Sequence, residues 1–269
     1  MATLTITGGR VIDPAGGRDE RTDVILADGQ VQRIGEVAKP DGPTFNASGC
    51  IVCPGLIDVH VHFREPGQEE RETIATGSAS AVNGGFTSVC CMPNTEPALD
   101  DDARIEFIYR QAARVGLCNV YPVGAITKGR GGEELAEIAL MARSGAVAFS
   151  DDGVAVASAA MMNKALTYVA MTGRPIMQHC EEPTLTQGAS MNAGLLATRL
   201  GLTGWPGVAE ELIIQRDLAL NRSTGCAYHV QHLSTAAGAD LVRRAQDAGL
   251  PVTAEASPAL SAALRCCGA

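Results

Sequence analysis

The rhythm of apolar and polar positions changes once along the chain, near residue 50. Residues 4–12 alternate between apolar and polar side chains, and shorter runs follow at 23–26 and 30–34. Gly-Gly and Asp-Gly pairs separate these runs, as in chains that turn back into β-hairpins. The pattern therefore predicts a small β domain over residues 1–50.

From residue 51 onward, short apolar runs alternate with segments of helix length. The expected strands are 51–59, 87–92, 119–125, 146–149, 175–178, 227–230 and 251–254. The expected helices lie near 72–83, 102–115, 133–143, 158–172, 208–222 and 236–248. Strict alternation of strand and helix favours parallel strands joined by helical crossovers. We expect a (β/α) barrel over residues 51–255.

The end of the chain departs from a complete barrel. No eighth strand is evident after residue 254, and residues 256–269 are rich in Ala, Ser and Cys without a strand pattern. No glycine-rich phosphate-binding motif follows the first expected barrel strand, which argues against a nucleotide-binding sheet. We expect an α/β fold, a (β/α)8-type barrel that is incomplete with about seven strands. The tail is read as a last short helix, a natural shortening or a gene-end artefact.

Composition narrows the class of protein further. The 269 residues carry a net charge of −9 and no basic stripe, so we expect no binding to nucleic acid. No run of about 18 apolar residues is present, and the first residues lack the pattern of a secretory signal. The nine cysteines are odd in number and scattered. We therefore expect reduced thiols, a cytoplasmic location and no membrane contact.

Four of the five histidines fall at the ends of expected strands. His60 and His62 end the first barrel strand, and residues two apart in a strand point the same way. His179 and His232 end the fifth and sixth strands, and an Asp-Asp pair that includes Asp152 ends the fourth. Active sites of such barrels lie at the carboxyl ends of the strands. Histidine nitrogens and a carboxylate converging there predict a Zn²⁺ site.

The order and spacing of five short motifs carry a family resemblance. These are PGLIDVHVHFREPG, GGFTSVCCMPNTEP, FSDDG, HCE and HLS. Together they resemble the metal-dependent amidohydrolase superfamily and, within it, the bacterial class I dihydroorotases, over about residues 1–255. The resemblance implies a (β/α)8 barrel with a small β domain. It also implies the reversible ring closure of N-carbamoyl-L-aspartate to L-dihydroorotate, a step of pyrimidine synthesis.

The resemblance assigns a role to each of these residues. His60 and His62 match the ligands of a first zinc ion, His179 and His232 those of a second, and Asp152 the carboxylate that bridges the two. Spacing favours Asp152 over its neighbour Asp151, although the two could be exchanged, and either could cap a helix.

Two further residues match the family's binding site for the substrate carboxylate. These are Arg64 and Asn94, and a planar guanidinium suits a carboxylate because it binds in bidentate fashion. The alternatives are a surface ion pair of Arg64 with Glu65 or Glu69, and a turn role for Asn94. His229 is expected to pack or support the site rather than to bind metal.

Other members of the superfamily, such as hydantoinases and allantoinases, bridge their metals with a carboxylated lysine. The three lysines here are Lys39, Lys128 and Lys164, and none ends the fourth strand, although Lys128 follows the third. This difference favours a dihydroorotase.

The family's proton-transferring Asp at the end of the eighth strand has no counterpart in this sequence. Glu255 is the only nearby carboxylate, and nothing in the sequence places it at the metals. Relative to the family the chain looks shortened, and we expect poor turnover or none. The alternatives are a non-catalytic scaffold for aspartate transcarbamoylase and another cyclic amidase. As partners we expect the small-molecule substrate and either a second copy of the chain or the transcarbamoylase.

Overall fold

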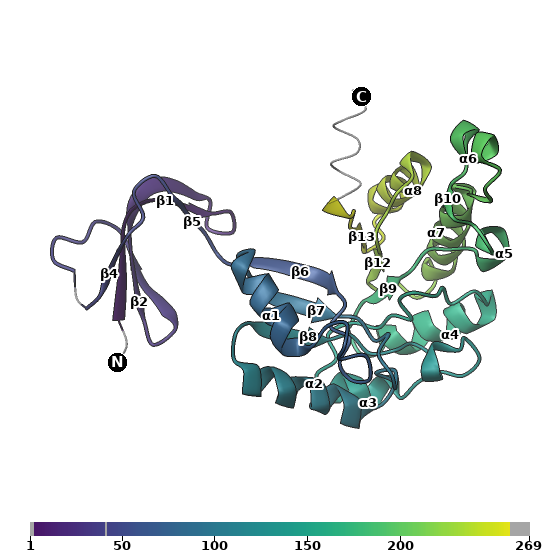
Figure 1. Cartoon of the computed structure of the whole chain (residues 1–269), viewed down its shortest axis with the longest axis horizontal. Helices are drawn as coiled ribbons and strands as arrows, with labels where there is room; N and C mark the ends of the chain where they lie inside the picture. The colour runs from purple at the N-terminus through teal and green to yellow at the C-terminus, as the bar shows by residue number, and fades with distance from the viewer. Residues whose placement is uncertain (1–2, 41, 259–269) are drawn as a thin grey trace. The chain divides into compact units, whose positions relative to one another are not determined.

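A computed structural model describes residues 3–40 and 42–258 of the chain (Figure 1). The chain divides into two compact units between Leu56 and Ile57. Of the tail expected at 256–269, residues 259–269 lie outside the described residues. In the described part of the chain, no helix is both long and apolar enough to cross a membrane.

The first unit is a five-stranded sheet. Its strands are β1 (Thr3–Asp13), β2 (Arg18–Ala27), β3 (Gln30–Ile34), β4 (Thr44–Asn46) and β5 (Ile51–Val52). β2 runs antiparallel to both β1 and β3, whereas β4 and β5 pair parallel to β1. Asp28 and Gly29 both have positive φ in the turn between β2 and β3, as a tight hairpin requires.

The expected strand at 51–59 is in fact two strands in two sheets. Ile51 and Val52 pair with β1, and the barrel strand β6 begins only at Leu56. Pro54 and Gly55 interrupt the run, since proline has no amide hydrogen to donate to a sheet. Cys50 and Cys53 flank β5, where extended backbone holds their Cα atoms about 10 Å apart, too far for a disulfide. The cysteines in the described part of the chain are all free.

The second unit places its strands side by side in chain order. One sheet holds β6 (Leu56–Val61), β7 (Phe86–Cys91) and β8 (Asn119–Pro122), and another holds β9 (Ile176–Gln178), β12 (Tyr228–Val230) and β13 (Val252–Ala254). The expected strand at 146–149 is an extended connection rather than a regular strand. Phe149 forms parallel bridges to Gly124 and to Ile176, so this segment joins the two sheets. The described residues thus supply seven successive strand positions.

Helices follow the strands as the pattern predicts. They are α1 (Ile74–Asn83), α2 (Asp102–Val115), α3 (Ile138–Arg143), α4 (Ala159–Ala170), α7 (Val208–Asn221) and α8 (Ala236–Asp247). α2 shows why its ends lie where they do: the Asp101 side chain accepts a hydrogen bond from Arg104 N, and Gly116 ends the helix at φ +63°. α3 begins later than expected because residues 133–137 form no helix.

An insertion that the pattern does not predict lies between β9 and α7. It contains α5 (Pro183–Thr186), β10 (Met191–Asn192), α6 (Leu195–Leu200) and β11 (Gly204–Trp205). The short 3-10 turn η1 (Lys128–Arg130) follows β8.

The core forms on both faces of the strands. Val89 and Cys91 of β7 pack in the large cluster that also contains helix residues such as Ile105 and Leu166. Cys90 and Met92 alternate with them and pack in a small second cluster with Val123, Ala148 and Met177.

Candidate functional site

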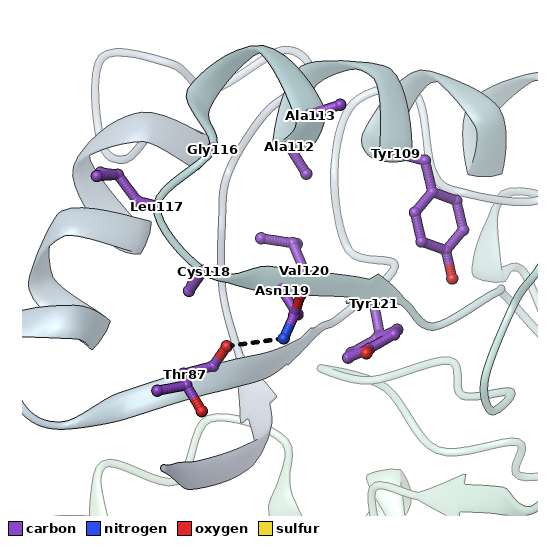
Figure 2. Close-up of a pocket in the computed structure, with 10 residues that line it drawn as sticks. All are labelled: Thr87, Tyr109, Ala112, Ala113, Gly116, Leu117, Cys118, Asn119, Val120 and Tyr121. Atoms are coloured by element: carbon purple, nitrogen blue, oxygen red, sulfur yellow. Dashed lines mark hydrogen bonds between the residues drawn. The ribbon is translucent and has the colours of Figure 1, made fainter. Parts of the chain in front are cut away.

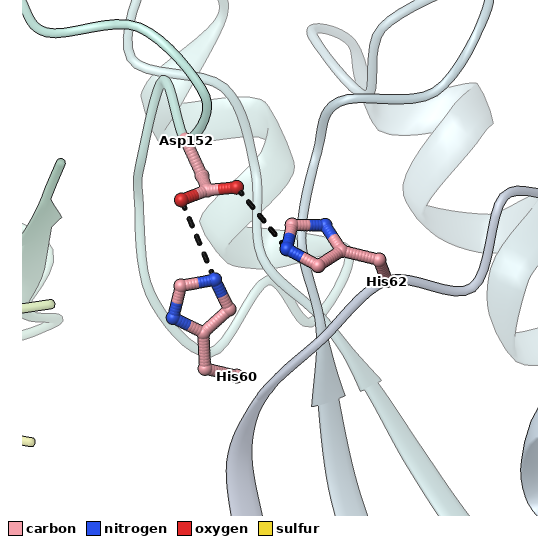
Figure 3. A group of neighbouring side chains, drawn as sticks. All are labelled: His60, His62 and Asp152. Carbon is pink, nitrogen blue, oxygen red and sulfur yellow. Dashed lines mark ion pairs between the residues drawn. The ribbon is translucent and has the colours of Figure 1, made fainter. Parts of the chain in front are cut away.

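The predicted site residues meet at the carboxyl ends of the strands. His60 lies in β6 and His62 directly after it, His179 follows β9, and His232 follows β12. Asp152 follows the extended segment that joins the two sheets. Figure 3 shows His60 and His62 directed at the two oxygens of the Asp152 carboxylate.

Asp152 lies at the centre of the four histidines. Its Oδ1 lies 3.4 Å from His60 Nε2, 3.6 Å from His179 Nδ1 and 4.0 Å from His232 Nε2. Its Oδ2 lies 3.6 Å from His62 Nε2. Two groups of three donor atoms result, each within 4.8 Å, and Asp152 belongs to both.

Asp151 points elsewhere and has a separate task. Its Oδ1 accepts hydrogen bonds from Ile126 N and Thr127 N, and its Oδ2 accepts one from Thr127 Oγ1 at 2.5 Å. Asp151 therefore anchors the loop after β8. Of the two neighbouring aspartates, the structure places Asp152 among the histidines.

These donors fit a divalent metal ion. Two donor atoms bound to one tetrahedral Zn²⁺ at about 2.0–2.1 Å lie about 3.3 Å apart. The separations of 3.4–4.0 Å around Asp152 are close to this value. Imidazole nitrogens and a carboxylate oxygen are also ligands that Zn²⁺ accepts.

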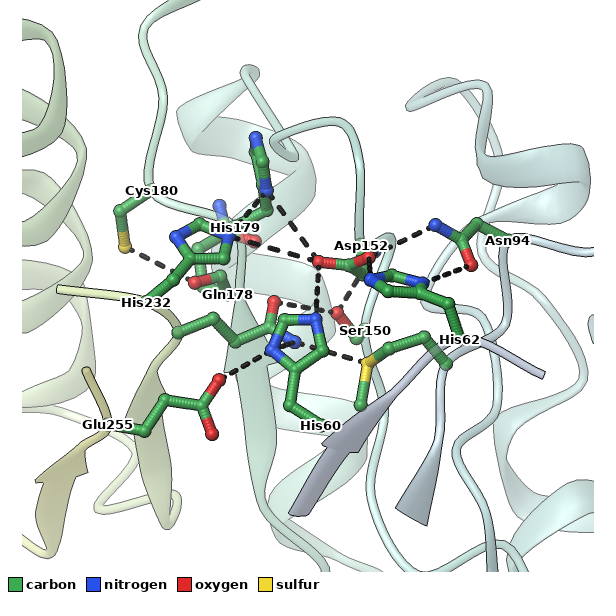
Figure 4. Close-up of polar contacts among 12 residues, drawn as sticks. His60, His62, Asn94, Ser150, Asp152, Gln178, His179, Cys180, His232 and Glu255 are labelled. Carbon is green, nitrogen blue, oxygen red and sulfur yellow. Dashed lines mark hydrogen bonds and ion pairs between the residues drawn. The ribbon is translucent and has the colours of Figure 1, made fainter. Parts of the chain in front are cut away.

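Three of the histidines have an oxygen acceptor on the ring nitrogen that faces away from Asp152. Figure 4 shows those of His60 and His62. His60 Nδ1 lies 2.5 Å from Glu255 Oε1, and His179 Nε2 lies 2.8 Å from Glu181 Oε2. His62 Nδ1 lies 3.0 Å from Asn94 Oδ1.

The charges in this cluster shift one another's pKa values. Burial alone would raise the pKa of Asp152, but hydrogen bonds from His179 and His60 and the charges of His60 and His62 outweigh it and hold that pKa well below its usual range. Burial lowers the pKa of His60, but Asp152 and Glu255 outweigh this effect and raise it to about 9. Burial lowers the pKa of His62. Asp152 is thus held as a carboxylate, the form that binds metal.

The two residues expected at the substrate carboxylate differ in their surroundings. Arg64 is half-buried, and its guanidinium makes no hydrogen bond or ion pair within the described residues. Glu65 instead accepts from Ile74 N and Gln111, and Glu69 accepts from Gly67 N. The alternative ion pairs of Arg64 are therefore not formed.

Asn94 is engaged with the cluster itself. Besides its contact with His62, its Nδ2 donates to Asp152 Oδ2 at 3.1 Å. An ordinary turn residue would not bridge two members of the cluster.

Lys128 lies away from the histidines, as a solvated cation 2.6 Å from Glu134. His229 contacts a neighbour of the cluster rather than Asp152: its Nε2 lies 3.3 Å from Glu255 Oε2. Nothing in the sequence placed Glu255 at the site, but in the structure it directly follows β13 and lies beside His60. Strand-end position could have identified Glu255, whereas nothing in the sequence indicated that Glu181 lies against His179.

The loop after His232 is held from a neighbouring helix. His232 has φ +36°, in the left-handed region that side chains other than glycine rarely adopt. Two residues later, Ser234 and Thr235 donate both their amides and their hydroxyls to the buried carboxylate of Glu210 in α7. These four hydrogen bonds fix the loop that presents His232.

A separate cavity of about 480 Å³ lies between the end of α2 and β8 (Figure 2). Its lining includes Tyr109, Leu117 and Tyr121 but no histidine and no carboxylate. The chemistry therefore lies with the histidine cluster.

Known proteins with similar sequences share one description. The family model for dihydro-orotase-like proteins matches residues 49–237. A dihydroorotase of Pelotomaculum thermopropionicum is 49% identical over 256 residues, covering 95% of this chain and 60% of the relative. One from Anaeromyxobacter dehalogenans is 50% identical over 257 residues, covering 95% of this chain and 59% of the relative. The chain spans about 60% of the length of these curated relatives.

Solved structures show the fold. L-hydantoinase (dihydropyrimidinase) from Arthrobacter aurescens has a TM-score of 0.79 at 23% identity, covering 96% of this chain and 59% of that one. N-acyl-D-glutamate deacylase from Bordetella bronchiseptica, complexed with zinc and a phosphonate inhibitor, has a TM-score of 0.66 at 22% identity, covering 95% and 58%. These likenesses support an amidohydrolase-type α/β fold. A family model matched over most of the chain, with about half of the residues shared with those relatives, shows that this protein belongs to the dihydroorotase-like family.

Proposed function

We propose that the histidine cluster is a zinc-dependent dihydroorotase site, which opens the ring of L-dihydroorotate to N-carbamoyl-L-aspartate and closes it again. The observation that carries this proposal is Asp152, whose carboxylate is shared by two histidine pairs. His60 and His62 would hold one Zn²⁺, and His179 and His232 a second, with Asp152 between them. The names of the relatives support the substrate.

Ring opening adds water across one amide bond. A new bond forms between the water oxygen and the ring carbonyl carbon, the carbon–nitrogen bond breaks, and the nitrogen takes a proton. When bound, divalent metal ions lower the pKa of water and polarise a carbonyl group. The protein's own contribution is to place the ring. Arg64, which has no partner in the described residues, would bind the substrate carboxylate, and Asn94 would orient it beside Asp152.

A hydantoinase-type cyclic amidase is the second candidate, because hydantoinases share this fold. Lys128 could not bridge the metals from its position beside Glu134, whereas Asp152 is already between the two histidine pairs. These two positions favour the dihydroorotase. A cytoplasmic location and an assembly with a second copy or with aspartate transcarbamoylase stay predictions.

The test is a metal and turnover assay on the full 269-residue chain. Zinc per chain is measured, and the chain is offered dihydroorotate, hydantoin and allantoin in turn. We expect about two zinc ions and slow turnover of dihydroorotate, both reduced or lost in His60→Ala. Zinc binding with no turnover of dihydroorotate would contradict the catalytic proposal, and preference for hydantoin or allantoin would contradict the substrate.

Arg64→Met tests the carboxylate contact. Losing a charge-assisted bidentate contact should raise KM by roughly 10–100-fold with zinc content unchanged. Arg110→Met, which removes an exposed arginine of α2, is the matched control and should leave KM unchanged. Equal KM values for the two variants would exclude Arg64 as the carboxylate-binding group.

A further inference from the structure

On the side of His60 that faces away from Asp152 lie the carboxylate of Glu255 and, farther away, the amide of Gln231, whose Nε2 is 3.5 Å from His60 Nδ1. Glu255 Oε1 lies 2.5 Å from His60 Nδ1, while His60 Nε2 faces Asp152 Oδ1 at 3.4 Å. The imidazole therefore lies between two carboxylates, one on each nitrogen. The side chains of His60 and Glu255 are only 12% and 19% exposed, so water competes weakly for this contact.

Glu255 is itself held from a second direction. Its Oε2 lies 3.3 Å from His229 Nε2, and His229 Nδ1 lies 2.7 Å from Thr253 Oγ1. Backbone bonds fix the segment as well: Glu255 N donates to Val230 O, and Leu233 N donates to Glu255 O. Glu255 thus has a defined position beneath His60.

From this arrangement we propose that Glu255 is a positioning residue for His60. With a cation bound, its carboxylate would accept the Nδ1 proton of His60, which leaves the Nε2 lone pair on the Asp152 side for the cation. The inference rests on the proposed function, in which His60 is a metal ligand. A carboxylate behind a metal-binding histidine orients the ring and makes it a better donor.

The geometry separates this role from that of a proton-transferring base. Glu255 faces Nδ1, whereas the reacting atoms would lie on the Nε2 side with Asp152. The ring of His60 stands between Glu255 and that space (Figure 4). Glu255 therefore acts through His60.

The experiment compares two variants of Glu255 in the full chain with one control. Glu255→Leu removes the acceptor, and Glu255→Gln keeps a carbonyl oxygen but loses the charge. Glu106→Gln removes an exposed carboxylate of α2 and is the matched control. Zinc affinity is measured by competition with a chelator. The ring N–H signals of His60 are followed in the zinc-loaded, ¹⁵N-labelled protein.

We expect Glu255→Leu to weaken the affinity for the more tightly bound of the two zinc ions by roughly 10–100-fold. The affinity of Glu255→Gln should lie between those of Glu255→Leu and wild type. Wild type should show a slowly exchanging Nδ1 proton on His60, and Glu255→Leu should lose it. A residue with only a structural role would lower the melting temperature of the metal-free chain without changing this proton.

The outcomes separate the two proposals. A wild-type chain that binds no zinc contradicts the proposed function. A chain that binds zinc but has no slow Nδ1 proton, or a Glu255→Gln affinity equal to that of Glu106→Gln, overturns the positioning role. These readings use wild type and the conservative variant, so they stand even where Glu255→Leu does not fold.

Discussion

Glu210 allows a stability prediction worked from its contacts. The side chain lies in α7, is 7% exposed and accepts four hydrogen bonds. Two come from Thr235, through N at 2.9 Å and Oγ1 at 2.6 Å, and two from Ser234. Thr235 Oγ1 also accepts from Gly238 N and so caps α8. Glu210→Ala removes the carboxylate that accepts the four hydrogen bonds from Ser234 and Thr235.

The size of the stability loss depends on which of the Ser234 and Thr235 donors water can reach once the carboxylate is gone. Ser234 is exposed, so water replaces much of what its two hydrogen bonds lose. Thr235 is half-buried, and its two bonds to a charged acceptor contribute about 1.5 kcal/mol each. Glu210→Ala should therefore lower the free energy of unfolding by about 3 kcal/mol. That loss is roughly a hundredfold in the folding equilibrium.

The assay is urea unfolding of the metal-free chain, followed by circular dichroism. Glu211→Ala is the control, because Glu211 is the next residue of the same helix and its carboxylate has no hydrogen bond among the described residues. Its effect should stay within about 0.5 kcal/mol. The midpoint should fall for Glu210→Ala with the slope unchanged. Equal midpoints for the two variants would refute the reasoning.

Two further predictions concern buried charge and backbone geometry. Burial raises the pKa of Asp217 to about 6 against the opposing effects of Arg216 and Tyr228, so the folded chain holds this proton more tightly than the unfolded chain. The stabilisation from this proton is full below about pH 4 and is lost as the pH rises through about 6. Between these limits, the free energy of unfolding of wild type should fall by about 3 kcal/mol relative to that of Asp217→Asn. A difference that does not change with pH would contradict this prediction. Gly67 has φ +95°, and a Cβ there would overlap the carbonyl oxygen of Glu96. Gly67→Ala should lower the free energy of unfolding by about 3 kcal/mol or more. Gly129 also has positive φ but lies in open space, so Gly129→Ala should lower it by only about 1–2 kcal/mol. Equal melting temperatures for the two variants would exclude the overlap.

Much of the second unit could be predicted because its pattern is local. Apolar runs mark β7, β8, β9, β12 and β13, and the helices between them begin and end close to the expected residues. The convergence of His60, His179 and His232 follows from strand order, since parallel strands bring their carboxyl ends to one edge. Their role as ligands stays a prediction.

What could not be predicted depends on contacts between distant segments. Ile51 and Val52 are apolar enough for either sheet, and only their pairing with β1 decides. The segment at 146–149 contacts both sheets: Val147 and Ala148 hydrogen-bond the end of β8 and the chain just after it, and Phe149 forms bridges to both sides. The strand-end position of Glu255 could have placed it near the site, but its pairing with His60 joins residues far apart in sequence, and no local pattern encodes that pairing.

The sharing of Asp152 by two histidine pairs also bears on how the chain assembles. His60 lies near the start of the second unit in sequence and His232 near its end, yet both come within 4.0 Å of the Asp152 carboxylate. The two metal ions that these groups would hold, with Asp152 common to both, would link β6 to β9 and β12. Because the unfolded chain offers no such meeting point, metal uptake would report completed folding. At a free metal concentration 1,000 times Kd, one bound metal ion would add about 4 kcal/mol to the free energy of unfolding. The free metal concentration would then set much of the free energy of unfolding.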